Sequence, residues 1–149
     1  MTAPSFVAQD PAYEARVRES FAQQRVMATL GVTIARVAPG EVVLALPYRH
    51  DLTQQHGYMH AGIVTTIADS ACGYAAFTLM PADSNVLSVE FKVNLMAPAR
   101  GERFEARARV LRAGRTITTC QADVVAFEGG EEKVVATLLG TMMCVPARP

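Results

Sequence analysis

The sequence predicts an α+β fold in which an antiparallel β-sheet lies against a long α-helix. Residues 87–95 and 103–110 alternate apolar and polar side chains with a period of two, which is typical of half-buried strands. Residues 60–79 are rich in small and apolar side chains over a length that exceeds a normal strand, which favours a helix. Turn residues separate the strands after Pro81, so this part is expected to form an antiparallel meander.

The N-terminal part is expected to hold a loose lead-in over residues 1–10 and then an additional helix. Residues 11–30 alternate charged and apolar side chains at helical spacing, and Gly31 is expected to end this helix. Its apolar stripe consists of Tyr13, Val17, Phe21 and Met27. Residues 32–37 and 42–46 are short apolar runs around Pro39-Gly40, which predicts a hairpin. Residues 48–59 are polar and irregular, and are expected to form a loop.

The helix expected over residues 60–79 carries conflicting local signals, because Ile63 to Ile67 is β-branched. The apolar spacing resolves the conflict, since Ile63, Ile67, Ala71 and Tyr74 fall on one helical face. Four strands are predicted after the helix, with turns at Ala113-Gly114 and Gly129-Gly130. They cover residues 87–95, 103–110, 115–127 and 133–145.

The composition of the chain limits its possible domain count, partners and location. A chain of 149 residues that is 50% hydrophobic and 19% charged fits one domain over residues 1–149. The formal net charge of zero gives no general reason to expect nucleic acid or a membrane as partner. No leader pattern or membrane-length apolar segment is evident, so a cytoplasmic protein is expected. The three cysteines form no CxxC pair and are expected to be buried free thiols: Cys72, Cys120 and Cys144.

Asp69 is the leading candidate for a catalytic residue. It stands in the middle of the predicted helix, where an unpaired buried carboxylate would cost several kcal/mol. A carboxylate in such a position is either a structural residue that faces solvent or bonds backbone, or a general base or nucleophile in a pocket. The spacing alone leaves both interpretations open.

A metal site is the weaker interpretation of the neighbouring histidines. His56 and His60 are four residues apart, and His50 or Asp69 could complete a ligand set. However, Gly57 indicates a loop and the Glu of an HExxH motif is missing, so no metal is expected. His60 is expected instead to bond backbone at the start of the helix.

Two further groups of residues could bind substrate. The amides of Ala61 and Gly62 open the predicted helix, where they have no intrahelical acceptor and could hold an oxyanion. Between Glu90 and Arg115 lie seven basic and three acidic residues, which form either a solvated strand face or a phosphate site that includes Arg100 and Arg115. Aromatic residues are not interleaved with these arginines, which disfavours nucleic acid.

Together these residues resemble the hotdog-fold thioesterases, and among them the PaaI-like acyl-CoA thioesterases of the 4-hydroxybenzoyl-CoA thioesterase superfamily. The family pattern places Asn or Gln, then Gly, then His-Gly-Gly before a catalytic acid in the central helix. The matching positions here hold Gln54, Gly57, His60-Ala61-Gly62 and Asp69. The run from Leu87 to Ala99 is also similar to the family's strand after the helix, and the resemblance covers about residues 27–145.

The resemblance implies a hotdog fold, with an antiparallel sheet wrapped around the central helix, and hydrolysis of acyl-CoA to free acid and CoA without a cofactor. Asp69 would be the general base or the nucleophile, and the Ala61 amide would polarise the thioester carbonyl. Gln54 would position substrate or water, Ser88 would orient water beside the acid, and His60 would bond near the thioester. Ala61 replaces a family glycine, which would weaken the oxyanion site if the amide needed a conformation that glycine adopts more easily.

The resemblance also implies an active site formed between two subunits. Asp69 and Ser88 would face Gln54 and Ala61 of a partner chain, and dimers would pair into tetramers. Predicted substrate contacts beyond the catalytic residues are Gly62, Tyr58, Met59, Asn94, Arg100 and Arg115, and Tyr74 and Phe77 are further candidates for an apolar lining. A medium-chain or aromatic acyl group is expected.

Two other functions stay open at this stage. A hotdog hydratase or dehydratase would act on acyl thioesters, but the proline-rich lead to its histidine is not found around His60. A non-catalytic acyl-CoA-binding module would gain little from a carboxylate beside a thioester, so Asp69 favours the hydrolase.

Overall fold

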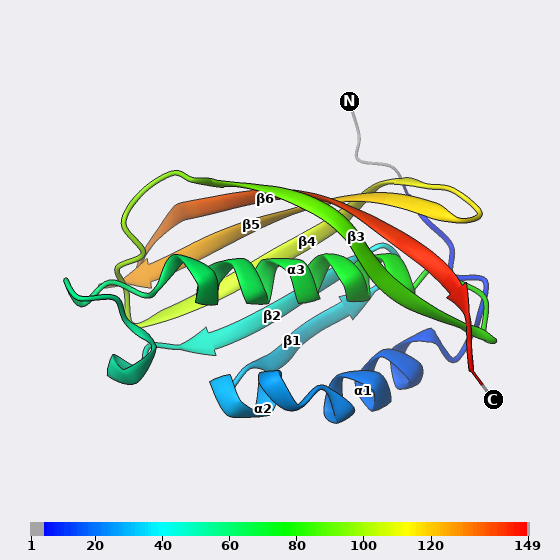
Figure 1. Cartoon of the computed structure of the whole chain (residues 1–149), viewed down its shortest axis with the longest axis horizontal. Coiled ribbons are helices and arrows are strands. Elements are labelled where there is room, and N and C mark those ends of the chain that lie inside the picture. The colour runs from blue at the N-terminus through cyan, green and yellow to red at the C-terminus, as the bar shows by residue number, and fades with distance from the viewer. Residues whose placement is uncertain (1–4, 149) are drawn as a thin grey trace.

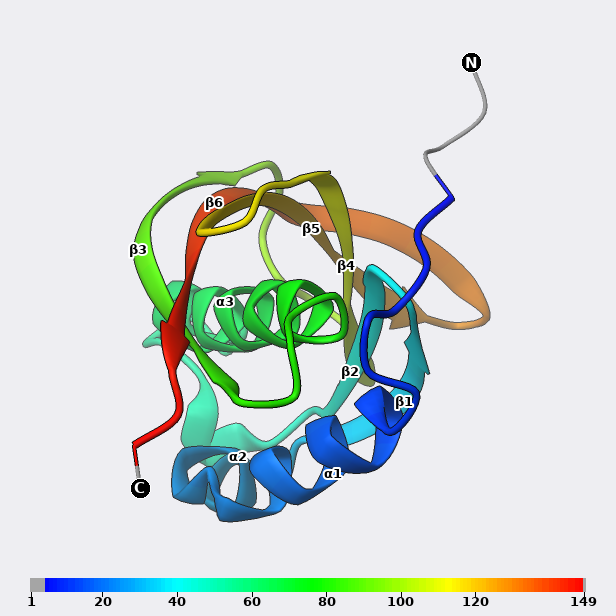
Figure 2. The same ribbon diagram turned by 90° about the vertical axis from the view of Figure 1, so that its right-hand side faces the viewer.

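The computed structural model describes residues 5–148 and shows a six-stranded antiparallel sheet curled around one long helix (Figure 1). The strand order across the sheet is β1-β2-β4-β5-β6-β3. The strands are β1 (Thr33–Ala38), β2 (Glu41–Pro47), β3 (Ser84–Leu95), β4 (Arg103–Ala113), β5 (Ile117–Glu128) and β6 (Glu131–Pro146). The central helix is α3 (Ala61–Phe77), and Figure 2 shows the sheet curving around it. The predicted α+β fold with a sheet wrapped around a helix is therefore confirmed.

The core forms where α3 meets the concave face of the sheet. Ile67, Ala71 and Cys72 of α3 are fully buried there. Alanines also line the facing strands, at Ala106 of β4 and Ala122 of β5. Small side chains on both elements let the helix axis approach the sheet closely, which explains why this helix contains so few large residues.

The N-terminal segment forms two helices, α1 (Tyr13–Gln23) and α2 (Arg25–Leu30), so the prediction of one helix over residues 11–30 was wrong. The break falls at Gln24, whose ψ of 92° is not helical. Val17 and Met27 are both fully buried, yet a continuous helix would rotate them roughly 80° apart. The break lets both helices turn an apolar side to the core, and Gly31 ends α2 in the left-handed conformation as predicted.

A β-bulge in β3 changes which side chains of this strand face α3. Ser88 pairs with Met142 of β6, whereas Glu90 pairs with the adjacent Thr141, so Val89 is the extra residue. The unbroken alternation predicted from the sequence would place Ser88 on the outer face with Glu90. The bulge instead turns Ser88 inward, while Glu90 stays outside.

β3 is also an edge strand with exposed apolar side chains. It pairs with β6 on one side only, and Leu87 and Leu95 are each 58% exposed, followed by Met96 at 63%. Long apolar edges in monomeric proteins invite pairing with another chain. This edge is therefore a candidate surface for association.

The loops differ from expectation in two places. The loop between β2 and α3 holds a short 3-10 helix (His50–Leu52) and an isolated β-bridge between Thr53 and Met59. Within the predicted loose lead-in, Phe6 packs on the core and Gln9 bonds the Leu79 carbonyl, so residues 5–10 are held in place. Residues 1–4 of that lead-in lie outside the described residues. No helix within residues 5–148 combines the length and hydropathy needed to cross a membrane.

Candidate active site

Asp69 and Ser88 form a hydrogen-bonded pair at the edge of a small cavity. The Ser88 hydroxyl donates to Asp69 Oδ1 at 2.7 Å, across the contact between β3 and the middle of α3. Asp69 is half-buried, so its carboxylate is stabilised by this bond and is still open to the cavity. We call this space the Asp69 cavity. It measures about 160 Å³ and is lined by Ser20, Gln24, Asp69, Ser70, Gly73, Tyr74, Val86 and Ser88.

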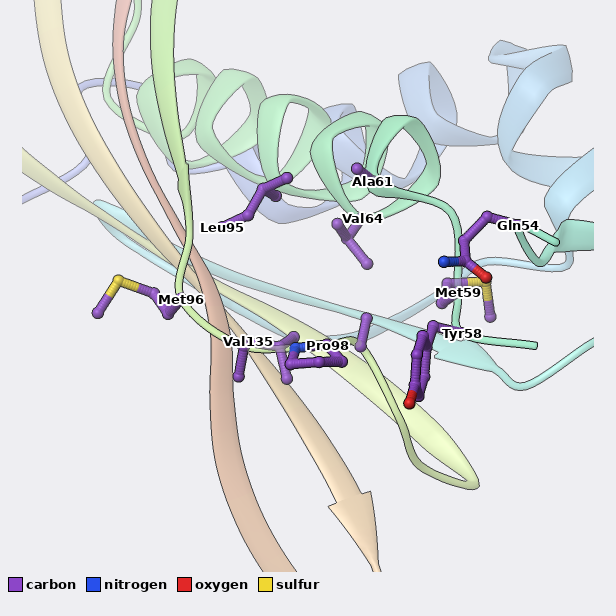
Figure 3. A pocket seen from close by; sticks show the side chains of 11 residues that line it. Gln54, Tyr58, Met59, Ala61, Val64, Leu95, Met96, Pro98 and Val135 are labelled. Carbon is purple, nitrogen blue, oxygen red and sulfur yellow. The ribbon is translucent and has the colours of Figure 1, made fainter. Parts of the chain in front are cut away.

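A second, larger and more apolar space lies at the start of α3 (Figure 3). We call it the Gln54 pocket. It measures about 490 Å³ and is lined by Gln54, Tyr58, Met59, Ala61, Val64, Leu95, Met96, Ala97, Pro98, Ala99 and Val135. The sequence had not singled out the segment from Leu95 to Ala99 as lining, because its side chains follow a strand end with no turn signal specific to a pocket. Tyr58 and Met59, two of the predicted substrate contacts, both line this pocket.

The loop that carries Gln54 is held by its own backbone. Gln54 N donates to Tyr58 O, and Gly57 N donates to Gln54 O at 3.0 Å. Gly57 has a φ of +83°, a left-handed conformation that favours glycine. The turn therefore sets Gln54 and Tyr58 side by side at the rim of the pocket (Figure 3).

His60 caps α3 and lines neither space. Its Nδ1 accepts a hydrogen bond from Gly62 N at 2.8 Å, which is the backbone bond expected for this residue. A Cβ on residue 62 would lie 3.0 Å from that nitrogen, so Gly62 is explained by the tight cap. Within residues 5–148 no three His, Cys, Asp or Glu side chains are grouped as metal ligands.

Ala61 carries the helix-start amide that remains available. The Gly62 amide is engaged by His60, whereas the Ala61 amide has no acceptor among the hydrogen bonds of residues 5–148. No residue other than glycine has a positive φ in this part of the chain, so Ala61 has a conformation that any L residue adopts. The methyl group of Ala61 therefore places no strain on an oxyanion site at this amide.

The two spaces do not meet within one chain. Ala61 and Asp69 are eight residues apart on one helix, which is about 12 Å along its axis. One protomer therefore holds the available amide and the carboxylate too far apart to act on the same carbonyl group.

The predicted phosphate contacts are separated as well. Arg100 lies close to the Gln54 pocket, because it lines neighbouring hollows together with Tyr58 and Pro98 of that pocket. Arg100 also forms an ion pair with Glu128 at 2.9 Å. Arg115 lies in a hollow with Leu79 and Met80, beyond the other end of α3, which is about 25 Å long. Arg100 and Arg115 of one chain therefore cannot contact the same ligand.

The other arginines of the basic segment are largely paired on the outer face of the sheet. Arg107 bonds Glu132 and Glu105, which raises the pKa of Arg107 and lowers that of Glu132. Arg103 also pairs with Glu105. This part of the segment therefore fits a solvated strand face, and Asn94, opposite Thr137 on the same outer face, lies away from both spaces.

The remaining predicted residues are buried, except Cys144. Tyr74 lines the Asp69 cavity, and burial raises the pKa of its phenol, whereas Phe77 lies in the core against Arg16.

The three cysteines are free: Cys72 and Cys120 are buried as expected, and Cys144 is half-buried. A hydrogen bond with Cys120, together with burial, raises the pKa of the Cys72 thiol. Sequence reasoning missed Ser20 and Gln24 as lining residues. The only signal in the sequence was the changed helical phase between Phe21 and Met27, which indicates a break near Gln24.

Comparison with known proteins identifies the family of this chain. The profile of the thioesterase superfamily matches residues 56–133. A thioesterase family protein from Silicibacter pomeroyi has a crystal structure that is 55% identical, with a TM-score of 0.90 over 91% of this chain and 99% of that one. A mutant of the phenylacetic acid degradation protein PaaI from Thermus thermophilus is 31% identical, with a TM-score of 0.71 over 80% and 98% of the two chains.

The human acyl-coenzyme A thioesterase 13 is 28% identical over 94 residues, which are 62% of this chain and 66% of that protein. The superfamily match begins in the loop at His56 and includes the whole of α3. It also covers β3, β4 and β5, and ends at the start of β6. With a sheet wrapped around α3 and an acid in the middle of that helix, the chain belongs to the thioesterase superfamily as a PaaI-like hotdog protein and is a thioester hydrolase.

Proposed function

We propose that the protein hydrolyses acyl-CoA thioesters to a free acid and CoA in an active site shared by two protomers. The observation that carries the proposal is the Ser88–Asp69 pair, because it holds a half-buried carboxylate at the edge of a cavity. Thioester carbonyls are poorly stabilised by resonance, so a carboxylate and one or two fixed N–H donors suffice for hydrolysis. Medium-chain or aromatic acyl groups are the proposed substrates.

The proposed chemistry has two forms. As a general base, Asp69 accepts a proton from water, the water oxygen bonds to the carbonyl carbon, and the CoA thiolate leaves. As a nucleophile, the Asp69 carboxylate displaces the thiolate and forms an anhydride, which water then hydrolyses. In both forms the Ala61 amide donates to the oxyanion, and Ser88 holds the carboxylate that starts the reaction.

The exposed apolar edge of β3 supports a shared site, because two copies could pair along it. The edge is apolar and unpaired, and a two-fold axis across it would run two copies of α3 antiparallel. The start of one helix would then approach the middle of the other, so that the Ala61 amide of one protomer meets Asp69 of its partner. The proposal also includes the association of two such dimers into a tetramer and a cytoplasmic location.

The Gln54 pocket is the proposed path for the pantetheine arm of CoA. It is mainly apolar, it begins at the Ala61 amide, and Arg100 stands beside its outer end. A guanidinium there would contact CoA phosphates, and its surface ion pair with Glu128 is weak enough to exchange.

Release of free thiol from a panel of short, medium, long and aromatic acyl-CoAs tests this function. We expect hydrolysis by the wild type and a loss of about 100- to 10,000-fold in kcat for Asp69→Asn, which keeps the size of the side chain and removes the base. Asp83→Asn is the matched control on an exposed carboxylate and should retain full activity. Unchanged turnover in Asp69→Asn contradicts the mechanism, and binding without thiol release would favour a non-catalytic module.

A further inference from the structure

The Asp69 cavity has a wall that the chemistry of hydrolysis does not require. Gly73 and Tyr74 come from the next turn of α3, and Ser20 and Gln24 come from α1 and from the break before α2. Figure 2 shows these N-terminal helices lying on the side of α3 that the sheet leaves open. The N-terminal helices thus close a space whose other side holds the reacting carboxylate.

Gly73 leaves this space empty at a cost to the helix. Glycine inside a helix destabilises it by about 1 kcal/mol relative to alanine. Apart from its two chain neighbours and the nearby backbone of its own helix, a Cβ built on Gly73 would meet no described atom within 4 Å. Packing against the rest of the chain therefore does not explain this glycine, in contrast to Gly62, and an occupant of the cavity does.

The wall opposite Asp69 is polar. The Tyr74 and Ser20 hydroxyls lie 3.3 Å apart, and the Ser70 hydroxyl donates to Gln24 Oε1 at 3.1 Å. Within residues 5–148 the other polar atom of the Gln24 amide has no hydrogen-bond partner. Reversal of the amide would leave its oxygen free in place of its nitrogen, so one hydrogen-bonding atom is available in either orientation.

The acyl end of the substrate suits this cavity better than the CoA end. This step rests on the proposed function, in which Asp69 acts at the thioester carbonyl and so stands between the two ends. None of the residues that line the cavity is Lys or Arg, and Asp69 gives it negative charge, which disfavours phosphates. Arg100 instead stands beside the Gln54 pocket.

We propose that Ser20, Gln24, Gly73 and Tyr74 form the acyl subsite, and that it selects a compact acyl group with a hydroxyl or similar hydrogen-bonding group at its far end. A cavity of about 150 Å³ holds a benzene-sized molecule, and this one measures about 160 Å³. It therefore accepts an acyl chain of about six carbons. A purely apolar chain of that length would leave the available atom of the Gln24 amide without a partner, and would bind less well.

Two acyl-CoAs that differ in one hydroxyl test the polar wall. For the wild type, kcat/KM for 6-hydroxyhexanoyl-CoA is expected to exceed that for hexanoyl-CoA by about tenfold. In Gln24→Leu, which keeps the shape of the side chain, this ratio is expected to fall to about one. Gln23→Leu makes the same change at the neighbouring exposed residue and should keep the wild-type ratio. A merely structural role for Gln24 would lower both values together and leave the ratio intact.

Gly73 is tested by filling the space. In Gly73→Leu, the preference for 6-hydroxyhexanoyl-CoA over acetyl-CoA is expected to drop by about tenfold or more. In Gly73→Ala, the melting temperature is expected to rise by about 2–4 °C, because the helix gains stability and nothing clashes. Loss of folded protein in Gly73→Ala would mean that the space is not open.

The outcomes separate the two proposals. A wild type that hydrolyses both six-carbon substrates equally well, with a ratio that Gln24→Leu does not change, overturns the acyl subsite and leaves acyl-CoA hydrolysis standing. A wild type that hydrolyses no acyl-CoA overturns the proposed function and the subsite together. A ratio that Gln23→Leu abolishes as fully as Gln24→Leu also overturns the subsite.

Discussion

The Ser88 hydroxyl reaches the Asp69 carboxylate, 2.7 Å away, because a bulge at Val89 turns Ser88 toward the helix. The two residues come from an edge strand and from the middle of the central helix. Each is short, so the bond depends on the backbone positions of β3 and α3. The reacting carboxylate of the proposed mechanism is therefore oriented by an irregularity in the sheet.

Removal of the Ser88 hydroxyl should slow the reaction without preventing substrate binding. In Ser88→Ala we expect kcat to fall about tenfold with little change in KM, because the carboxylate loses the hydrogen bond that orients it. Steady-state kinetics with a good acyl-CoA substrate measures both constants. Ser88→Thr keeps a hydroxyl and should recover most of the lost rate, and equal losses in both variants would contradict an orienting role.

Ala61→Pro should remove the oxyanion donor and keep the helix. Ala61 is the first residue of α3, a position where proline is well tolerated, and the extended conformation of His60 (φ −61°, ψ 138°) is compatible with a following proline. We expect kcat to fall about 100- to 1,000-fold while the melting temperature stays close to that of the wild type. Circular dichroism during heating and thiol release measure the two effects.

Ala61→Gly is the control for this amide, because it changes the side chain and keeps the N–H group. Since Ala61 already has an ordinary backbone conformation, its activity should stay within about threefold of the wild type. A large gain in Ala61→Gly would show that the methyl group obstructs the site.

A site shared by two protomers predicts complementation between inactive variants. In a mixed dimer of Asp69→Ala and Ala61→Pro chains, one of the two sites has an intact carboxylate from one chain and an intact amide from the other. Random pairing after joint refolding should restore about a quarter of wild-type activity. Two variants with the same lesion, Asp69→Ala and Asp69→Asn, should restore none when mixed. A mixture of the first pair that stays inactive, although mixed dimers form, would argue that each site belongs to one chain.

Arg16 should be important for stability, because it closes the C-terminal end of α3. Its guanidinium donates to the carbonyls of Phe77, Met80 and Pro81, pairs with Asp10 at 3.1 Å and lies over the Phe77 ring. In Arg16→Ala we expect a loss of about 2 kcal/mol, because these carbonyls lose their donors, and a melting temperature lower by about 4–8 °C.

The neighbouring Arg18 provides the comparison for Arg16. It forms only a half-exposed pair with Glu14 one turn away, so Arg18→Ala should cost less than about 0.5 kcal/mol. Equal melting temperatures for the two variants would contradict the role of Arg16 as a link between α1 and α3.

Much of the local structure could be predicted from the sequence. The hairpin around Pro39-Gly40, the end of α2 at Gly31 and the later strands follow from turn chemistry and periodicity, which act between near neighbours. The central helix was predicted correctly despite its β-branched start, because apolar spacing over its whole length outweighs local propensity. Asp69 was identified for the same reason, as a carboxylate on a helix of small and apolar residues.

Other features depend on contacts between distant residues, and only the tertiary structure decided them. The break at Gln24 arises because Val17 and Met27 must both reach one core, and the inward turn of Ser88 arises from its pairing with β6. The sequence could not separate Arg100 from Arg115, since their distance depends on the length and position of α3. Periodicity is a property of one segment, whereas a site is a property of several, so the acid was evident from the sequence and its surroundings were not.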